Sequence, residues 1–279
     1  MDLSLLKTFL EVFRTRHFGS AAENLHISQS AVSARIKQLE EILGAALFTR
    51  VRNGIQLTTA GQRFLPHAEV MLTAWSRARQ DMIATQESGQ SLAIGGMFSL
   101  WDCLLNDWIT RVHEHDTTLA LMLEAQSQDV LVRKLIDEAL DLCFMFEAPQ
   151  LTNLIEREVA AVKLIMVSTQ PTLDQSRAFD ENYIYVDWGQ SFSHEHARHF
   201  PDMPYPTLRM SHAHLAFAFL SGAGGTAYLA ENSVREPLEK RELYRVTGAP
   251  VMIRQAYAVY AANNKKAPLI EDLLQLIRE

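Results

Sequence analysis

Residues 18–40 constrain the fold of this chain more than any other segment. They read FGSAAENLHISQSAVSARIKQLE and predict two short helices joined by a tight turn. Ser28 stands where the N-cap of the second helix is expected, because a serine hydroxyl can accept from the free backbone N–H groups of the next turn. Val32, Ile36 and Leu39 then form an apolar stripe, so the polar side chains of this helix point the other way. This layout is typical of a helix-turn-helix that reads DNA.

The outward face of the second helix is short, polar and weakly basic. Gln29, Ser30 and Ser33 are expected to read base edges, because Gln pairs bidentately with adenine and Ser bonds to either base of a pair. Arg35 and Lys37 are expected to meet phosphates, which position a protein without reading sequence. The alternative is a small helical bundle with a solvated face.

A wing is predicted directly after this helix. Gly44 is expected to end the helix, and the Asn-Gly pair at 53–54 predicts a tight turn between two short strands. Arg50, Arg52 and Asn53 lie where a wing would touch the DNA backbone or the minor groove. The alternative is a solvated hairpin.

Charge is divided unevenly along the 279 residues, whose net charge is −7. Residues 1–86 carry ten Lys and Arg against seven Asp and Glu, a net of +3, and the remainder carries 16 against 26, a net of −10. Positive charge is therefore confined to the segment that would meet phosphates. Because the excess is modest, tight binding is expected to need two or more such segments on one DNA.

Length and composition favour two or three domains, and an apolar content of 48% is ample for buried cores. No run of eighteen or more apolar residues predicts a membrane span, and the N-terminus lacks a basic-then-apolar leader, so a cytosolic protein is expected. Cys103 and Cys143 are expected to be reduced core residues, with a disulfide switch as the alternative.

A long helix is predicted from Thr58 or Thr59, either of which can cap it, to about Gln86. Its apolar side chains alternate spacings of four and three, as in the seam of a coiled coil. We expect the same helix of a second copy to cover this seam, so that a dimer presents two heads to two related half-sites. The alternative is that the seam packs on the body domain of its own chain. The seam residues are Phe64, Ala68, Met71, Trp75, Ala78 and Met82.

After a short polar linker at 87–90, strand-like and helical runs alternate. Such alternation predicts a mostly parallel α/β sheet with helices on both faces. Two consecutive sets suggest two lobes with a cleft between them. The first set has strands at 91–95, 119–124 and 140–146 and helices at 100–112 and 130–138. The second has strands at 162–169, 183–187 and 208–210 and a helix at 214–220, and a last helix spans 268–277.

The first sixty residues resemble the LysR-type transcriptional regulators without a gap. The matching pattern comprises Leu6, Phe9, Phe18, Ala21-Ala22, Leu25, Ser28-Gln29-Ser30-Ala31-Val32-Ser33, Ile36, Leu39-Glu40, Leu43-Gly44, Leu47-Phe48, Arg50, Leu57-Thr58 and Ala60-Gly61. A narrower resemblance to the HdfR-like branch, whose named member represses the flagellar master operon, is carried by LLKTFLEV, RTRHFG, SLWDCLLNDW and the residues Trp188, Gly189, Phe192 and His194.

The resemblance implies three parts: an all-α winged helix-turn-helix DNA-binding domain over residues 1–58, a linker and dimerisation helix over 59–86, and an effector-binding domain over 87–279. The last would be a two-lobed, periplasmic-binding-protein-like α/β domain, with lobe I at about 91–160 and 263–279 and lobe II at about 161–262. The chain would cross between lobes near 160–162 and return near 258–262. By the same analogy, a homodimer, and further a homotetramer, is expected.

Clefts of this kind collect small ligands, because strand ends and helix N-termini face them with free N–H donors. Ser99 is the first candidate to contact an effector, and Ser127 and Gln128 at the next strand-to-helix turn are the second. Gly224 and Thr226 belong to a turn that resembles the glycine turn of the family. Each could instead be a plain helix cap or loop residue. The family's Leu-Pro and Tyr-Pro pairs are replaced at 104–106 and 116–118, so the state of the pocket stays open.

The histidines of SHEHARH, namely His194, His196 and His199, lack the Cys or carboxylate set that a zinc site needs. A solvated, titratable loop is expected there instead. The Gly222–Gly225 turn is no phosphate loop, because no Gly-Lys-Ser/Thr follows it. No Gly-x-Ser-x-Gly elbow is present either, so no catalytic residue, metal or cofactor is predicted.

These patterns together predict a homo-oligomeric, sequence-specific transcriptional regulator and not an enzyme. Its partners would be double-stranded DNA and a second copy of the chain, with a small-molecule effector and RNA polymerase as further candidates and no membrane. Repression of flagellar or related operons is an expectation from the resemblance alone. The alternative is a small-molecule receptor with a degenerate DNA-binding head, which would lack the steep salt dependence of a DNA binder. An enzyme has only the cleft in its favour.

Overall fold

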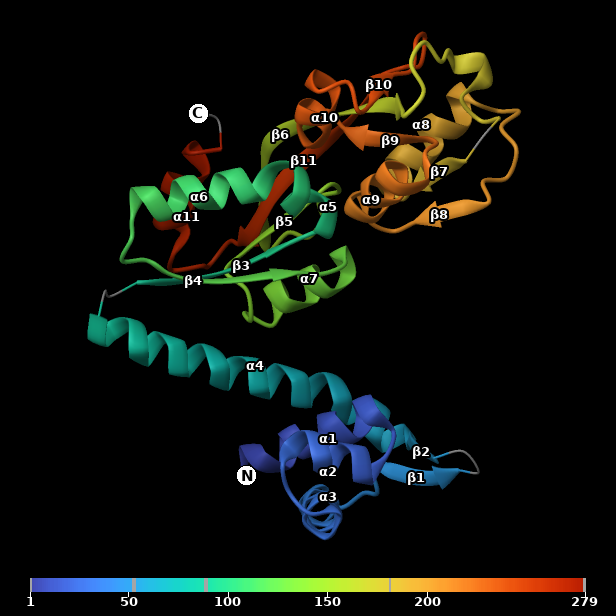
Figure 1. Ribbon diagram of the computed structural model, residues 1–279. Coiled ribbons are helices and arrows are strands. Elements are labelled where there is room, and N and C mark those ends of the chain that lie inside the picture. The colour runs from blue at the N-terminus through green and yellow to red at the C-terminus, as the bar shows by residue number, and fades with distance from the viewer. Residues whose placement is uncertain (1, 52–53, 88–89, 181, 278–279) are drawn as a thin grey trace. The chain divides into compact units, whose positions relative to one another are not determined.

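The computed structural model describes residues 2–51, 54–87, 90–180 and 182–277. The chain forms two compact units, Met1–Glu87 and Ser88–Glu279, which we call the head and the body. They correspond to the blue-to-teal and the green-to-red parts of the ribbon (Figure 1). The head contains α1 Leu3–Thr15, α2 Phe18–Leu25, α3 Gln29–Leu43, β1 Phe48–Val51, β2 Gly54–Leu57 and α4 Thr59–Glu87.

Capping side chains and a glycine set the ends of the helices of the head. Asp2 caps α1 by accepting from the Ser4 N–H at 2.8 Å, and the Ser28 hydroxyl oxygen accepts from the Ala31 N–H at 3.2 Å, so the predicted cap of α3 is confirmed. Gly44 ends α3 with a φ of 68°, in the left-handed region that a glycine adopts without strain. One apolar core holds the unit together, with Phe9, Val12, Ala21, Val32 and Leu39 all fully buried.

The body is built on one mixed sheet in the order β4-β3-β5-β11-β6-β9-β7-β8, with β10 added beside β6. Its strands are β3 Ser91–Gly96, β4 Ala120–Ala125, β5 Leu142–Met145, β6 Leu154–Ser168, β7 Tyr183–Val186, β8 Leu208–Met210, β9 Thr226–Ala230, β10 Tyr244–Arg245 and β11 Met252–Ala261. Its α-helices are α5 Phe98–Leu100, α6 Asn106–His115, α7 Gln128–Ile136, α8 Gln190–His199, α9 Ala213–Ala223, α10 Arg235–Glu239 and α11 Ala267–Gln275.

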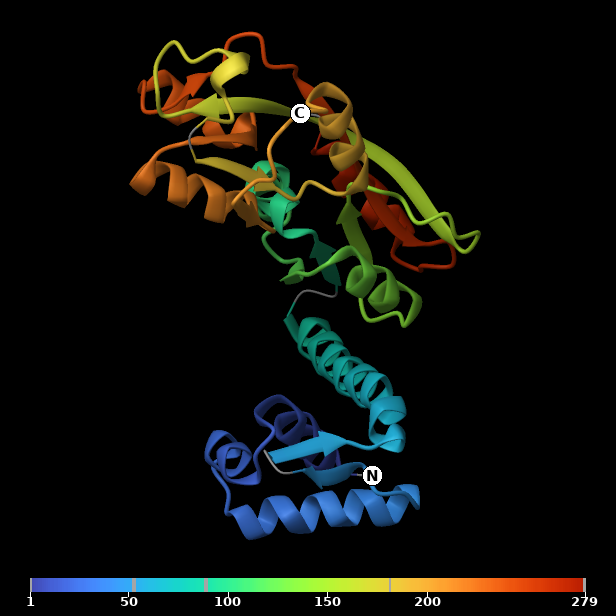
Figure 2. The same ribbon diagram turned by 90° about the vertical axis from the view of Figure 1, so that its right-hand side faces the viewer.

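Two parallel strand sets lie at the two ends of this sheet, as the alternation of strands and helices predicts. The pairings of β6 and β11 that join the sets are antiparallel, so the sheet is mixed and not mostly parallel as expected. β3 is parallel to β4 and β5 in the first lobe, and β7 is parallel to β8 and β9 in the second. Between them, β6 and β11 run antiparallel from Leu154↔Ala261 to Leu164↔Met252, and Figure 2 shows these long strands passing together through both lobes. β11 also pairs with β5 from Tyr257 to Val259, so one continuous strand makes the return to lobe I.

Helices cover both faces of the first lobe, with α6 and α11 on one face and α7 on the other (Figure 1). Trp108 on α6 is fully buried and its indole N–H donates to the Leu273 carbonyl on α11 at 2.9 Å. The helix predicted over 100–112 is not regular, since a π-helical turn over Trp101–Leu105 separates α5 from α6. Such π turns are local interruptions of an α-helix.

The second lobe corrects the expectation for the histidine-rich run. Residues 190–199 form α8 and not a solvated loop. His196 is 2% exposed and its Nε2 lies 2.6 Å from the Tyr183 hydroxyl. Burial lowers the pKa of His196 to about 4, with a smaller contribution from the charge of His199. Phe192, His196 and Phe200 recur at a spacing of four, so one side of this helix is buried against the aromatic core.

Both cysteines lie in the core of the body as free, buried thiols. Burial raises the pKa of the Cys103 thiol to about 12 and that of Cys143 well above its usual value. Thiols in this state are inert, because the thiolate is the reactive form. Among the helices that the structure describes, none is long and apolar enough to cross a membrane.

Candidate nucleic-acid interface

The recognition face predicted on α3 is free in the head. Gln29, Ser30 and Ser33 are exposed, whereas the opposite stripe is buried, with Val32 and Leu39 at 0% exposure. Because a helix places residues three and four apart on one side, the burial of that stripe turns the three polar side chains outward. They can therefore reach a duplex without any rearrangement of the unit.

Among the residues that the structure describes, the exposed side chains of α3 make only weak contacts. The hydroxyls of Ser28 and Ser30 lie 2.9 Å apart, and the Lys37 ammonium lies 3.7 Å from a Glu41 carboxylate oxygen. Both lysine and glutamate are largely exposed, so this pair contributes little to stability. Either contact can give way to a base or a phosphate at small cost.

Arg35 differs from the other predicted contact residues. It is partly buried, and its Nη1 lies 3.5 Å from the Thr8 hydroxyl on α1. The Ser4 N–H is the main group that lowers the pKa of Asp2, with Arg35 as a smaller, charged contributor. The guanidinium thus lies near Thr8 of α1, and a contact of Arg35 with a phosphate stays a prediction.

The turn between α2 and α3 explains how the two helices approach closely. His26 adopts a left-handed φ of 53°, and the Ile27 N–H donates to the Ala22 carbonyl at 3.0 Å. Ala21 and Ala22 are buried where the helices meet, and their small side chains permit the approach. Glu11 on α1 accepts from Asn24 on α2 at 2.6 Å and so joins the two helices.

The wing consists of β1 and β2, paired in register from Phe48↔Leu57 to Val51↔Gly54. Arg50 belongs to β1, opposite Ile55, whereas Arg52 and Asn53 lie outside the described residues. A residue not singled out by the sequence positions this hairpin. The Glu40 carboxylate, at the far end of the α3 face, accepts from the Leu47 N–H at 2.7 Å and the Phe48 N–H at 3.3 Å. Glu40 appears only in the family pattern, since nothing in its local spacing shows that its side chain reaches the wing.

The first half of the predicted α4 seam packs against the core of the head. Ala68 is 0% exposed, and Phe64 and Met71 pack against the same core, with the rings of Phe64 and Phe9 5.2 Å apart. The seam prediction is therefore wrong for Ala68, which the core of its own chain covers, whereas Phe64 and Met71 are partly exposed and their contact with a second copy stays a prediction. Thr58 caps α4 through its hydroxyl, which accepts from the Gly61 N–H at 3.0 Å.

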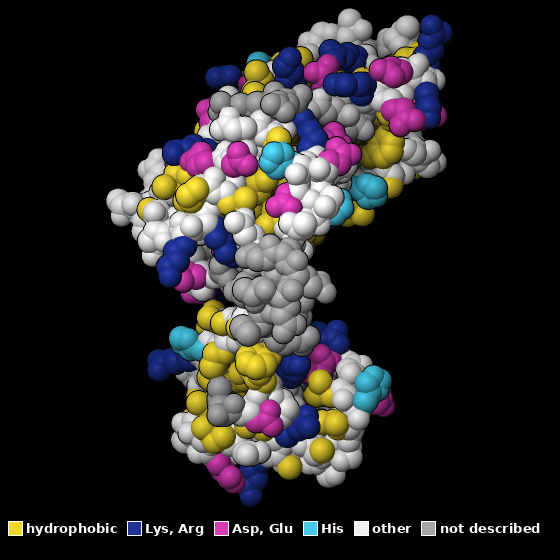
Figure 3. All heavy atoms as spheres, turned by 90° about the vertical axis from the view of Figure 1, so that its left-hand side faces the viewer, with side chains coloured by type: hydrophobic (Ala, Val, Ile, Leu, Met, Phe, Trp, Pro, Cys, Tyr) yellow, Lys and Arg dark blue, Asp and Glu magenta, His cyan; other side chains and the backbone are white. Residues whose placement is uncertain are grey.

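The second half of the seam remains available. Trp75 is 48% exposed and Ala78 is exposed, while the side chain of Met82 lies outside the described residues. Figure 3 shows hydrophobic side chains gathered on one face of the head. Exposure of a tryptophan to this extent leaves a large apolar area in water, which a second copy could cover.

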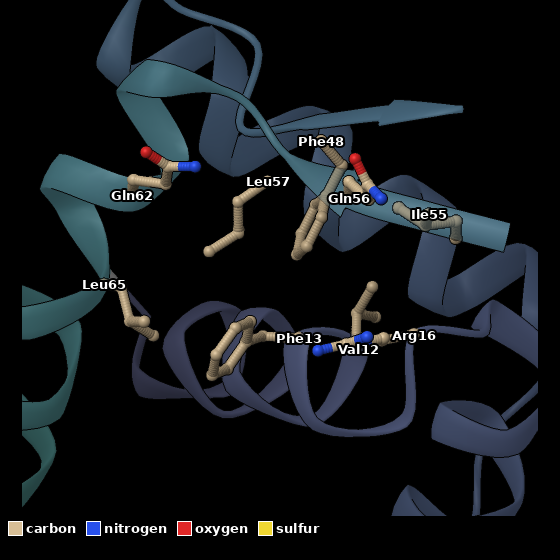
Figure 4. Close-up of a pocket in the computed structure, with 9 residues that line it drawn as sticks. All are labelled: Val12, Phe13, Arg16, Phe48, Ile55, Gln56, Leu57, Gln62 and Leu65. Atoms are coloured by element: carbon tan, nitrogen blue, oxygen red, sulfur yellow. The ribbon is translucent and has the colours of Figure 1, made fainter. Parts of the chain in front are cut away.

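An apolar pocket of about 350 Å³ lies between α1, the wing and the start of α4 (Figure 4). None of its lining residues belongs to α3, so the proposed base-reading side chains stand outside it. The lining residues are Val12, Phe13, Arg16, Phe48, Ile55, Gln56, Leu57, Gln62 and Leu65.

The body places the predicted effector residues in different surroundings. Ser99 is 6% exposed in the first helical turn after β3. Ser127 is an exposed N-cap of α7 whose side chain makes no capping bond, and Gln128 beside it is half-buried. These two remain accessible to a small molecule.

The hydroxyl of the glycine turn is buried and already hydrogen-bonded. Thr226 is 2% exposed and its hydroxyl donates to the Ala178 carbonyl at 2.5 Å. Gly224 has a φ of 72°, and the Gly225 N–H donates to the Thr169 hydroxyl. The hollow that Thr226 helps to line is about 10 Å³, room for roughly one water molecule. The Thr226 hydroxyl is therefore used within the fold, and a contact of this turn with an effector stays a prediction.

No group of three or more His, Cys, Asp or Glu side chains in the described ranges is arranged to hold a metal ion. His196 is the most buried of the three candidate histidines, and its Nε2 is hydrogen-bonded to the Tyr183 hydroxyl.

Comparison with known protein families assigns both units. The family described as "Bacterial regulatory helix-turn-helix protein, lysR family" matches residues 3–62, and "LysR substrate binding domain" matches residues 85–279. The chain is 38% identical to the HTH-type transcriptional regulator HdfR of Escherichia fergusonii, over 99% of this chain and 98% of the relative. It is 39% identical to HdfR of Salmonella schwarzengrund, with the same coverage.

Solved structures of the same architecture agree. CbnR, a LysR family transcriptional regulator, matches with a TM-score of 0.77 at 19% identity, over 100% of this chain and 98% of that one. CbnR in complex with its target DNA matches with a TM-score of 0.75, over 100% and 99% of the two chains. The relatives are named as regulators and none as an enzyme. The matches span both units, and the chain belongs to the LysR family of bacterial helix-turn-helix transcriptional regulators.

Proposed function

We propose that the chain binds double-stranded DNA at a specific sequence through α3 and the wing, as a homodimer or a larger homo-oligomer, and that a small molecule bound by the body alters this binding. The observation that carries the proposal is the exposed polar face of Gln29, Ser30 and Ser33 opposite a buried apolar stripe. In this proposal these three residues contact base edges. Lys37, Arg50, Arg52 and Asn53 contact the backbone or the minor groove.

Charge supports the same assignment of roles. The head segment 1–86 carries a net of +3, and the remainder carries −10. A head of such modest charge binds DNA weakly by itself, because each phosphate neutralised adds only one counterion-release contribution. Two heads on adjacent half-sites gain from effective concentration, so pairing of subunits is part of the proposal.

Pairing is assigned to the exposed part of α4. Trp75 is 48% exposed on a helix whose earlier apolar residues are already covered. A Trp75→Glu variant is expected to shift the chain to monomers in analytical ultracentrifugation. Glu69→Gln, an exposed position of the same helix outside the predicted seam, serves as the control. An intact dimer in Trp75→Glu would place the subunit contact elsewhere.

The test of DNA reading compares matched and scrambled duplexes. Genome-wide recovery of bound DNA first identifies an operator, and also tests the expectation of flagellar or related targets. Gln29→Ala should then weaken binding to the operator by about 1–3 kcal/mol and leave binding to scrambled DNA unchanged. Equal losses on both duplexes would contradict base reading by Gln29 and reassign it to the backbone.

The ligand response is assigned to the body, where Ser127 and Gln128 remain reachable. A ligand can change DNA binding only through different affinities for two arrangements of the protein. RNA polymerase is a further partner that regulation of a promoter would involve. DNA affinity without a steep salt dependence would favour the alternative, a receptor with a degenerate head.

A further inference from the structure

A buried arginine in the body has one donor without an acceptor. Arg254 on β11 is 3% exposed, and its Nη2 donates to a Glu147 carboxylate oxygen at 3.1 Å. Its Nε is the buried side-chain nitrogen that, within the described ranges, has no hydrogen-bond partner. The guanidinium carbon lies 5.3 Å from the centre of the Phe146 ring. A buried arginine with an unused donor has capacity for a further acceptor oxygen, because guanidinium binds carboxylates bidentately.

The same guanidinium lies at the N-terminus of α8, a helix of ten residues. Gly189 precedes this helix with a φ of 93°, and a Cβ built there would lie 3.0 Å from Arg254 Nη2 and 3.3 Å from the Glu147 oxygen. The Ser191 N–H donates to that oxygen at 3.3 Å. Glycine therefore lets an arginine and a helix N-terminus converge on one carboxylate oxygen, where the free N–H groups and the helix dipole both favour negative charge.

The carboxylate at this point comes from the other lobe. Glu147 follows β5 of the first lobe, whereas α8 follows β7 of the second. Arg254 lies on β11 before the bulge between Ala256 and Tyr257, after which that strand pairs with β5. Glu147 thus joins the two lobes. Its side chain is 38% exposed while that of Arg254 is 3% exposed, so solvent reaches the carboxylate side of the pair.

We propose that Arg254, Gly189 and the Ser191 N–H form a carboxylate-binding site that the chain's own Glu147 occupies, and that a small carboxylate from solvent competes with Glu147 for it. Displacement would break the contact between the lobes at this point. The regulatory use of this site rests on the proposed function above. The binding of a carboxylate at the site is independent of that proposed function.

The test removes the internal carboxylate and supplies an external one. In the full-length chain, Glu147→Ala should lower the melting temperature by about 5 °C, because it leaves a buried charge unpaired. Sodium acetate should then raise the melting temperature of this variant saturably and beyond sodium chloride of equal ionic strength. Wild-type protein should respond less. Glu147→Gln, which keeps the side-chain size, replaces Glu147→Ala if the latter does not fold.

The matched control is Glu231→Ala. Glu231 also pairs with an arginine, Arg245, and is 32% exposed, but its partner on β10 is 54% exposed and so is not a buried charge. Acetate should not act on this variant beyond chloride. Absence of an acetate-specific rise in the Glu147 variant that is tested, or an equal rise in Glu231→Ala, would overturn the site.

A second measurement separates the site from the regulatory role. DNA affinity of wild-type protein is titrated with acetate at constant ionic strength, and a change that the Glu147→Ala/Arg254→Met variant lacks supports regulation through this site. If acetate stabilises Glu147→Ala but leaves DNA affinity unchanged, the carboxylate site stands and its regulatory use is contradicted.

Discussion

In the head, the side chains proposed to read DNA come from one helix and lie within residues 29–37. In the body, the polar groups with the most unusual surroundings come from distant segments, since Arg254 and Glu147 are 107 positions apart and Lys266 and Asp141 are 125 apart. The residues of a surface built on one helix can be predicted from the sequence, because the helical period shows which of them share a face. A site assembled across a sheet depends on topology, so its parts carry no local signal.

This comparison predicts that changes in the body can be large in stability yet leave DNA reading intact. Asp141 is 1% exposed, and one of its carboxylate oxygens accepts from the Ala93 N–H at 2.9 Å and from the Lys266 ammonium at 2.9 Å. Asp141→Ala should lower the free energy of unfolding by about 3–5 kcal/mol. The substitution leaves the buried Ala93 N–H without its acceptor and the half-buried Lys266 ammonium without its partner carboxylate. Urea unfolding measures this loss.

Asp141→Asn keeps an acceptor for the Ala93 N–H and should lose less. Both variants should bind operator DNA with wild-type affinity at temperatures where they are folded. A loss of DNA affinity equal to the loss of stability would remove the contrast between the two units.

The second prediction concerns pH. The unfolded chain protonates His196 near pH 6.5, and the folded body does so only near pH 4, since burial lowers its pKa. The stability that the buried, neutral His196 contributes is therefore fully present above pH 6.5. It is lost as pH falls from 6.5 towards 4, by up to about 3 kcal/mol. Urea unfolding at a series of pH values measures it.

His196→Gln keeps a polar partner for Tyr183 and removes the titration, so its stability should vary less over this window. His194→Gln, on an exposed position of α8, is the control and should retain the wild-type slope. An unchanged slope in His196→Gln would mean that other groups cause the loss.

The third prediction sharpens the account of the head. Glu40→Ala leaves the Leu47 and Phe48 N–H groups without their acceptor and should cost about 1–2 kcal/mol of stability. Because Glu40 positions the wing and not the α3 face, DNA affinity should fall on matched and scrambled duplexes alike. Glu41→Ala, the exposed neighbour that only approaches Lys37, should change little. A selective loss on the matched duplex would show that Glu40 orients α3 itself.

The smallest effect is expected at Lys37. Its ammonium is exposed and only 3.7 Å from Glu41, so Lys37→Ala should hardly alter stability. If Lys37 meets a phosphate, the slope of log affinity against log salt should decrease by about one and specificity should stay constant. An unchanged slope would remove Lys37 from the DNA contacts.

Much of the head could be predicted from its sequence. The α3 cap at Ser28, its end at Gly44 and the stripe of Val32, Ile36 and Leu39 were all expected and are present. The assignment of Ala68 to a subunit seam is wrong, because a spacing of four and three shows which side of a helix is apolar and not what covers it. Only the packing against α1 decided that.

In the body, the sequence by itself determined the alternation of strands and helices, and hence the two parallel sets. Tertiary structure alone decided that His196 is buried, that the Thr226 hydroxyl is used internally and that Arg254 faces Glu147. The physical reason is the range of the interactions: hydrophobic periodicity and capping act within a few residues, whereas burial and charge pairing depend on which strands the chain brings side by side.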